Sequence, residues 1–371
     1  MSTISSLSFE LVEHIVYYID RIADLYQCAR VSKSFYMAST PKLWYSPTDQ
    51  PNSPKDHSVN AMVLRTLYSH RGPEHYYQFD RILTREEYEQ LRPWRYILPL
   101  GMVPLVPLGH CIRKLQLSGR DRCRTMVFLL DQTPLVEDLT ITKDFVINIF
   151  IRNCVAERCP QLTRIHLHAN PSILGLLASF AKHCRHIRHI VLSLPTRLAL
   201  ESLAAFKDHR LESLEIEANR RLTMSLQNPK SFLSGLQNLT SFKIGHFGGI
   251  WSPCGFMAAL LPTTTTTRPL PLLTSFTITN MFYVDDDFMV PFIAAHPRLE
   301  SMVLNDCKIG EATLYAIATH LSRLRHLSID QYSGLSPQVI KHVVDHCPVL
   351  DKVLCSNVAA ERELKEMIRL A

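Results

Sequence analysis

Residues 299–329 read LESMVLNDCKIGEATLYAIATHLSRLRHLSI and hold two copies of one short pattern. The pattern is an aliphatic residue, two other residues, an apolar residue, one other and a second apolar residue, as in Leu299, Met302 and Leu304. It begins again 25 residues later, at Leu324. The alternation in its last three positions predicts a short strand with one buried face.

The same pattern occurs ten times between residues 112 and 355, at intervals of 24 to 34 residues. Apolar residues at helical spacing lie between the copies, as in Leu314, Ile317, Ala318 and Leu321. Each repeat is therefore predicted to be one strand and one helix. A unit of about 26 residues cannot form its own core, so neighbouring repeats must stack. The copies begin at Ile112, Val136, Leu162, Ile187, Leu211, Leu239, Leu273, Leu299, Leu324 and Leu350.

The packing distances of the two element types predict a curved array. Strands pack about 4.8 Å apart and helices 8 to 10 Å apart, so the strands should lie on the concave side of a horseshoe. The repeats resemble the leucine-rich-repeat family, in its cysteine-containing subtype. The resemblance implies an α/β fold, a right-handed solenoid with a parallel concave sheet and convex helices. The residues that carry it are Cys159-Pro160, Cys184, Cys307 and Cys347-Pro348, with Asn170 and Asn219 at the post-strand place of Cys307.

Composition limits the classes of function. Forty Lys and Arg against 34 Asp and Glu leave a net charge of +6 without a basic run, so no nucleic-acid partner is expected. No run of about 18 apolar residues indicates a membrane span, and the first residues lack a basic signal-peptide region. We expect a cytoplasmic or nuclear protein whose ten cysteines are reduced core residues, with no disulfide or metal role.

Residues 7–44, LSFELVEHIVYYIDRIADLYQCARVSKSFYMASTPKLW, show helical spacing and predict three short helices. This segment resembles the F-box, the adaptor-binding motif of SCF-type ubiquitin ligases. It departs at Ser8, where the family usually has proline, and at Phe35, where it often has tryptophan. The alternative is an ordinary helical cap of the repeat array. The matching residues are Leu7, Glu10, Leu11, Ile15, Tyr18, Ile19, Asp24, Leu25, Cys28, Val31, Lys33, Leu43 and Trp44.

The resemblance implies that this segment binds a Skp-family adaptor and, through it, cullin and RING subunits. The residues implied in adaptor binding would divide between the interface and the packing of the helices. They are Leu7, Glu10, Leu11, Ile15, Ile19, Leu25, Val31 and Trp44.

Three segments follow as predicted domains. Residues 1–47 form the F-box, residues 48–110 a helical linker or cap with helices around 59–69 and 84–95, and residues 111–371 the repeats. A capping helix is expected over 359–370, and an exposed loop at the threonines of 263–267.

Polar side chains of the predicted strands should project from the concave face and bind an unknown target protein. Charge concentrates in the middle repeats, which suggests recognition of a charged or phosphorylated peptide, with Arg164 clamping the anion and histidines adding affinity below about pH 6.5. Chance clustering on a solvated face is the alternative, and a zinc site of three histidines is a weaker idea. The residues are Arg164, His166, His168, His189, Glu215 and Glu217.

No catalytic constellation or cofactor motif stands out, because neither a phosphate loop nor a recognisable triad is present in the sequence. We expect a non-enzymatic substrate-recognition subunit of an SCF-type ubiquitin ligase. Two alternatives remain open: a non-degradative repeat scaffold, and a regulator of a GTPase-like enzyme.

Overall fold

The computed structural model describes most of the repeats and the first helices, and the residues it describes fall into two compact units. One unit comprises residues 1–165 with 182–185, and the other 166–181 with 186–371. The described residues are 7–47, 63, 108–117, 129–142, 149–168, 173–193, 195, 197–217, 236–245, 256–262, 269–281, 283–329 and 336–355.

Ten strands form a sheet in which each strand follows its predecessor in the chain. Each strand begins two residues after the first position of one copy of the sequence pattern. Seven neighbouring pairs have a defined register, and all seven are parallel. The predicted α/β repeat fold with a parallel sheet is therefore confirmed. The strands are β1 (Lys114–Leu117), β2 (Asp138–Ile141), β3 (Arg164–His168), β4 (His189–Ser193), β5 (Ser213–Glu217), β6 (Ser241–Gly245), β7 (Ser275–Thr279), β8 (Ser301–Asn305), β9 (His326–Ile329) and β10 (Lys352–Cys355).

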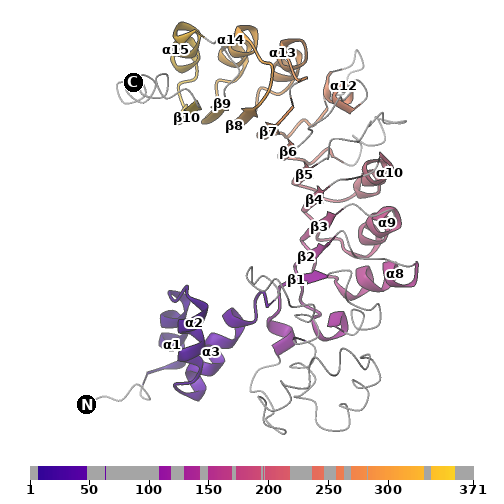
Figure 1. Ribbon diagram of the computed structural model, residues 1–371, viewed down its shortest axis with the longest axis vertical. Helices are drawn as coiled ribbons and strands as arrows, with labels where there is room; N and C mark the ends of the chain where they lie inside the picture. Colours follow the sequence, from indigo (N-terminus) through magenta and orange to yellow (C-terminus); the bar gives the residue numbers. More distant parts are fainter. Residues whose placement is uncertain are drawn as a thin grey trace. The chain divides into compact units, whose positions relative to one another are not determined.

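Helices connect the strands, as the spacing predicts, and within the second unit α13, α14 and α15 line one side of β7 to β10 (Figure 1). Apolar residues of the pattern that the structure places are at most 8% exposed. The repeats thus bury their apolar positions against one another. The helices are α8 (Ile149–Arg158), α9 (Ile173–His183), α10 (Arg197–Glu201), η4 (Ser202–Phe206), α12 (Phe256–Leu260), α13 (Asp286–Ala295), α14 (Glu311–His320) and α15 (Pro337–His346).

One backbone carbonyl just before a strand accepts two hydrogen bonds from the start of the next strand. The Glu212 oxygen, for example, accepts from the N–H groups of Thr240 and Ser241, both at 2.9 Å. We call this arrangement the shared-carbonyl bond. Because it joins equivalent positions of neighbouring repeats, it fixes their register. The acceptors are Arg113, Glu137, Arg188, Glu212, Thr240, Thr274, Glu300 and Arg325.

The three predicted amino-terminal helices are present as α1 (Phe9–Tyr17), α2 (Ile22–Ala29) and α3 (Lys33–Leu43). They pack around Val12, Val16, Leu25 and Phe35. The ammonium of Lys42 donates to the carbonyls of Tyr17 at 2.8 Å and Ile19 at 2.6 Å, and so satisfies backbone groups at the end of α1. We call these helices the three-helix module.

The module joins the first strand through Tyr45. The Tyr45 carbonyl accepts from the N–H groups of Arg113 and Lys114, both at 3.0 Å, and the short 3-10 helix η3 (Leu108–Cys111) precedes them. Tyr45 therefore acts toward β1 as Arg113 acts toward β2. The sequence predicts that residues 48–110 dock the amino-terminal helices onto the first repeat. Tyr45, which precedes that segment, contacts the start of β1 directly.

Several predictions fall outside the described residues. They concern Asn170, Asn219, the loop at 263–267, the capping helix at 359–370 and, except for the buried Val63, the linker helices. No described helix has the length and apolar character needed to cross a bilayer.

Four cysteines of the repeats lie in the core. Cys159, Cys184, Cys307 and Cys347 are buried, and the thiol of Cys184 donates to the carbonyls of Ala156 at 3.2 Å and Cys159 at 3.3 Å. Burial raises the pKa of Cys184 to about 12 and that of Cys347 to about 11. These thiols are therefore protonated and shielded near neutral pH.

Thiol labelling should separate the buried cysteines from the half-buried ones. We expect Cys28 and Cys154 to react with iodoacetamide at pH 8 in the native chain, and Cys184 and Cys347 to react at least about 100-fold more slowly, because the thiolate is the reactive form. Peptide mapping by mass spectrometry measures this, with labelling in guanidinium as the control. Equal rates for Cys184 and Cys28 in the native protein would contradict the placement.

Candidate functional site

An apolar face runs along α1 on the side away from the module's core. Leu7 is 37% exposed, Leu11 53%, Ile15 43% and Tyr18 68%. Positions three or four apart share one face of a helix, so Leu11 and Ile15 lie on one face of α1, with Leu7 just before the helix and Tyr18 at its C-cap. We call these four residues the α1 apolar face.

The core of the module is formed by a neighbouring face of the same helix. Val12 is 1% exposed and Val16 3%. Helical spacing alone does not select these valines as the core, because α1 carries apolar side chains on two faces. Their position immediately after Leu11 and Ile15 was the available signal.

The other residues implied in adaptor binding lie partly in the core of the module and partly at its surface. Leu25 is 1% exposed and Ile19 packs partly buried against the core, so both stabilise the module. Val31 is 57% exposed and extends the accessible apolar surface. Trp44 is half-buried and ends α3, with its N–H donating to the Thr40 carbonyl at 3.0 Å.

The structure also describes the surroundings of Phe35 and Ser8, the two residues that depart from the F-box pattern. Phe35 is 8% exposed within the module core, so an aromatic ring there serves packing. Ser8 precedes α1 with an extended backbone, and Glu10 lies exposed in the first turn. Hydrogen bonds from the Glu10 N–H and the Ser8 hydroxyl lower the pKa of the Glu10 carboxyl.

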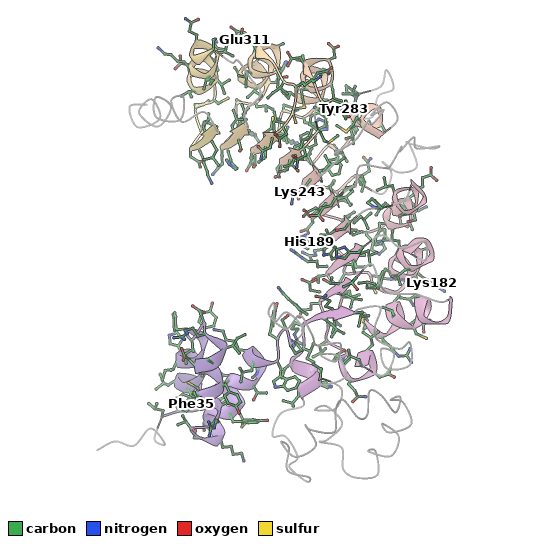
Figure 2. The ribbon with its side chains drawn as sticks, viewed as in Figure 1. Phe35, Lys182, His189, Lys243, Tyr283 and Glu311 are labelled. Carbon is green, nitrogen blue, oxygen red and sulfur yellow. The ribbon has the colours of Figure 1, made fainter. Side chains whose placement is uncertain are left out.

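The second predicted site lies on the polar face of the sheet, which is the side where alternate strand residues are not buried. His189 and Lys243 project on this side, away from the helices of their unit (Figure 2). Arg164 begins β3 with an exposed side chain and belongs to the first unit.

His166 is joined to Glu217 through Ser193. The Ser193 hydroxyl donates to Glu217 Oε2 at 2.8 Å, and His166 Nε2 lies 2.9 Å from the same hydroxyl. Because the hydroxyl proton points to the carboxylate, Nε2 must be the donor to Ser193. This order places serine between histidine and acid, whereas a catalytic triad places histidine between serine and acid.

Glu215 is bound by a cation of the next strand. Its carboxylate forms an ion pair with the Lys243 ammonium, and the two residues are register partners on β5 and β6. The two predicted acidic residues therefore have different partners: Glu215 pairs with Lys243, and Glu217 accepts from Ser193. The partners of the acidic pair, Ser193 and Lys243, were not among the predicted site residues, and their register positions beside Glu217 and Glu215 identify them.

Burial lowers the pKa of His166, and the neighbouring His168 lowers it further, while Glu217 and Glu215 raise it. The His166 and His168 ring centroids are 4.4 Å apart. Charge on His166 therefore requires a lower pH than the 6.5 predicted from an ordinary histidine. Among the described residues, no group of three side chains could hold a metal ion, so the zinc alternative gains no support.

Comparison with known proteins gives only distant likenesses. No family model matches the chain, and no curated protein matches it. A chain of the crystal structure of the Rad7 and Elc1 complex in yeast aligns with TM-score 0.45 and 15% identity, covering 64% of this chain and 59% of that one. The crystal structure of a TLR13–ssRNA13 complex aligns with TM-score 0.43 and 18% identity, covering 68% and 34%.

A protein from Bacteroides fragilis aligns with TM-score 0.31 and 16% identity, covering 52% of this chain and 65% of that one. This chain spans less than two thirds of the length of each of these three structures. We therefore base the functional conclusions on the residues of the chain itself.

Titration of His166 tests the arrangement around Ser193. We expect a pKa below 6.5, lowered further in Glu217→Gln and raised in His168→Gln, because these neighbours act in opposite directions. NMR of the histidine ring protons measures it, with His166→Gln to assign the signal. The stabilising contribution of neutral His166 is present above pH 6.5 and is lost as the pH falls through the folded pKa. A pKa above 6.5 would contradict the burial.

Proposed function

We propose that this chain is a substrate-recognition subunit of an SCF-type cullin-RING ubiquitin ligase. The three-helix module binds a Skp-family adaptor, which connects it to cullin and RING subunits. The polar face of the sheet binds the target protein. The observation that carries this proposal is the α1 apolar face, four large apolar side chains that are 37% to 68% exposed.

Exposure of these side chains favours the adaptor-binding interpretation over a simple helical cap. A cap would turn its apolar stripe toward the repeats and bury it. Here the described contact with β1 comes instead from the Tyr45 carbonyl, at the end of α3. Leu7, Leu11 and Ile15, which match the F-box pattern, remain accessible to a partner.

The proposed mechanism is proximity without bond chemistry in this chain. The module is joined to β1 by two backbone hydrogen bonds, and strand follows strand within each unit through the same kind of bond. Binding the adaptor through the module and the target through the repeats brings the target near the ubiquitin-charged conjugating enzyme. Restricting distance and orientation is itself a source of rate acceleration.

Arg164 remains our proposed contact for an anionic or phosphorylated group of the target. Its side chain is exposed at the start of β3. A guanidinium can bind a carboxylate or phosphate through two parallel hydrogen bonds.

Adaptor binding should be lost when charge is placed on the α1 apolar face. We expect Leu11→Asp with Ile15→Asp to reduce recovery of a purified Skp-family adaptor at least about tenfold, because buried apolar anchors dominate interfaces. Affinity pull-down with the full chain measures this. Val349→Asp is the matched control, since Val349 is 46% exposed outside the module.

Both variants should keep the circular dichroism spectrum and thermal melting of the parent chain, because the substituted side chains lie at the surface. Equal adaptor recovery by the double variant and the control would remove the basis of the adaptor assignment.

Target turnover separates a ligase subunit from a non-degradative scaffold. In cells, proteins marked by proximity labelling with the intact chain should accumulate when the chain carries Leu11→Asp and Ile15→Asp, because they lose their connection to the ligase. Quantitative mass spectrometry with and without proteasome inhibition measures this. The point variant is preferable to deletion of residues 1–47, which would also remove the Tyr45 carbonyl that binds β1. Unchanged target levels would favour the scaffold.

A further inference from the structure

A cavity of about 310 Å³ opens at the carboxyl ends of strands β5 to β8, within the second unit. Glu217 and Lys243 line it from β5 and β6, and Thr279 and Asn305 from the ends of β7 and β8. Asp306 follows immediately after β8. Its size is at the lower end of ligand sites, which suits one inserted side chain rather than a folded surface.

Gly245 ends β6 and is one of the residues that line this cavity. Gly245 is the register partner of Glu217 on one side and Thr279 on the other, so its row otherwise carries side chains. A Cβ atom at Gly245 would lie 2.1 Å from Thr279 Oγ1. The Thr279 hydroxyl therefore occupies the place that a side chain at Gly245 would take.

Acceptor groups predominate around this cavity. Glu217 and Asp306 carry negative charge, and no ion pair among the described residues involves Asp306. The Asn305 Oδ1 is buried and accepts no hydrogen bond from any described residue. A buried polar atom without a partner is uncommon, and the terminal torsion of asparagine turns easily toward an incoming donor.

Among the lining residues that the structure describes, the one cation is already engaged. Lys243 forms its ion pair with Glu215, a residue outside the cavity lining. An anionic ligand would meet two carboxylates and would have to compete for Lys243. A ligand with several N–H donors and positive charge would satisfy the carboxylates and the asparagine oxygen together.

We propose that this cavity receives a lysine or arginine side chain from a protein segment bound along the polar face of the sheet. The assignment rests on the proposed function only in taking a protein as the ligand. It gives the target a second chemical requirement, a basic residue that reaches β5 to β8, in addition to the anion predicted for Arg164.

Selection from a random dodecapeptide library displayed on phage, against the immobilised full chain, tests this site. We expect enriched peptides to share one Lys or Arg. Replacing that residue by Gln in the synthetic peptide should weaken binding about tenfold or more in fluorescence anisotropy, because charged hydrogen bonds are lost.

Variants of the chain then locate the binding. Glu217→Gln with Asp306→Asn removes the charge with little change of shape, and asparagine tolerates the left-handed backbone of Asp306, whose φ is 54°. Glu300→Gln with Glu212→Gln is the control of equal charge, since neither residue lines the cavity. We expect about tenfold weaker binding in the first pair and less than twofold change in the second.

Filling the cavity separates insertion from general electrostatic attraction. Gly245→Val with Thr279→Ala occupies the space while removing the hydroxyl that would clash. This double variant should weaken binding of the selected peptide as strongly as removal of the Glu217 and Asp306 charges does.

Enrichment of peptides without a cation, absence of any enrichment, or unchanged affinity in the filled variant would overturn the proposal. None of these results bears on adaptor binding, which is tested separately by the variants on α1. Failure of the cavity proposal is therefore distinguishable from failure of the proposed function.

Discussion

The shared-carbonyl bond is the interaction on which the rest of this fold depends. In each instance one carbonyl accepts the N–H groups of the first residue of the following strand and of the residue before it, so the strands that it joins start in register. A slip of one residue would turn the apolar positions of a strand toward solvent. The bond therefore holds in place the apolar side chains whose burial stabilises the repeats.

Tyr45 extends the same constraint to the three-helix module. Its carbonyl takes the acceptor position for β1, so the module is joined to the repeats as a preceding repeat would be. This leaves α1 free to keep its apolar face exposed, because α1 is not needed to cover the first strand. The Tyr45 carbonyl thus joins the module to the repeats while the α1 apolar face stays exposed.

Fixed register also creates the chemistry of the polar face. Residues at one strand position form rows, which bring Glu215 beside Lys243 and Gly245 between Glu217 and Thr279. Ser193 lies in the same row as Glu217 and connects it to His166. Residues that are far apart in the chain therefore become neighbours in one row, where they form an ion pair or line the same cavity.

The sequence by itself determined the repeat, the strand positions and the existence of three amino-terminal helices, because hydrophobic period is a local property of the chain. All ten strands begin where the pattern places them. Only the tertiary structure decided which apolar face of α1 is buried, with Val12 and Val16 inside and Leu11 and Ile15 outside. It also decided that Lys243 engages Glu215 and that the ends of β5 to β8 line a cavity. Those outcomes depend on contacts between residues far apart in the chain, which periodicity cannot specify.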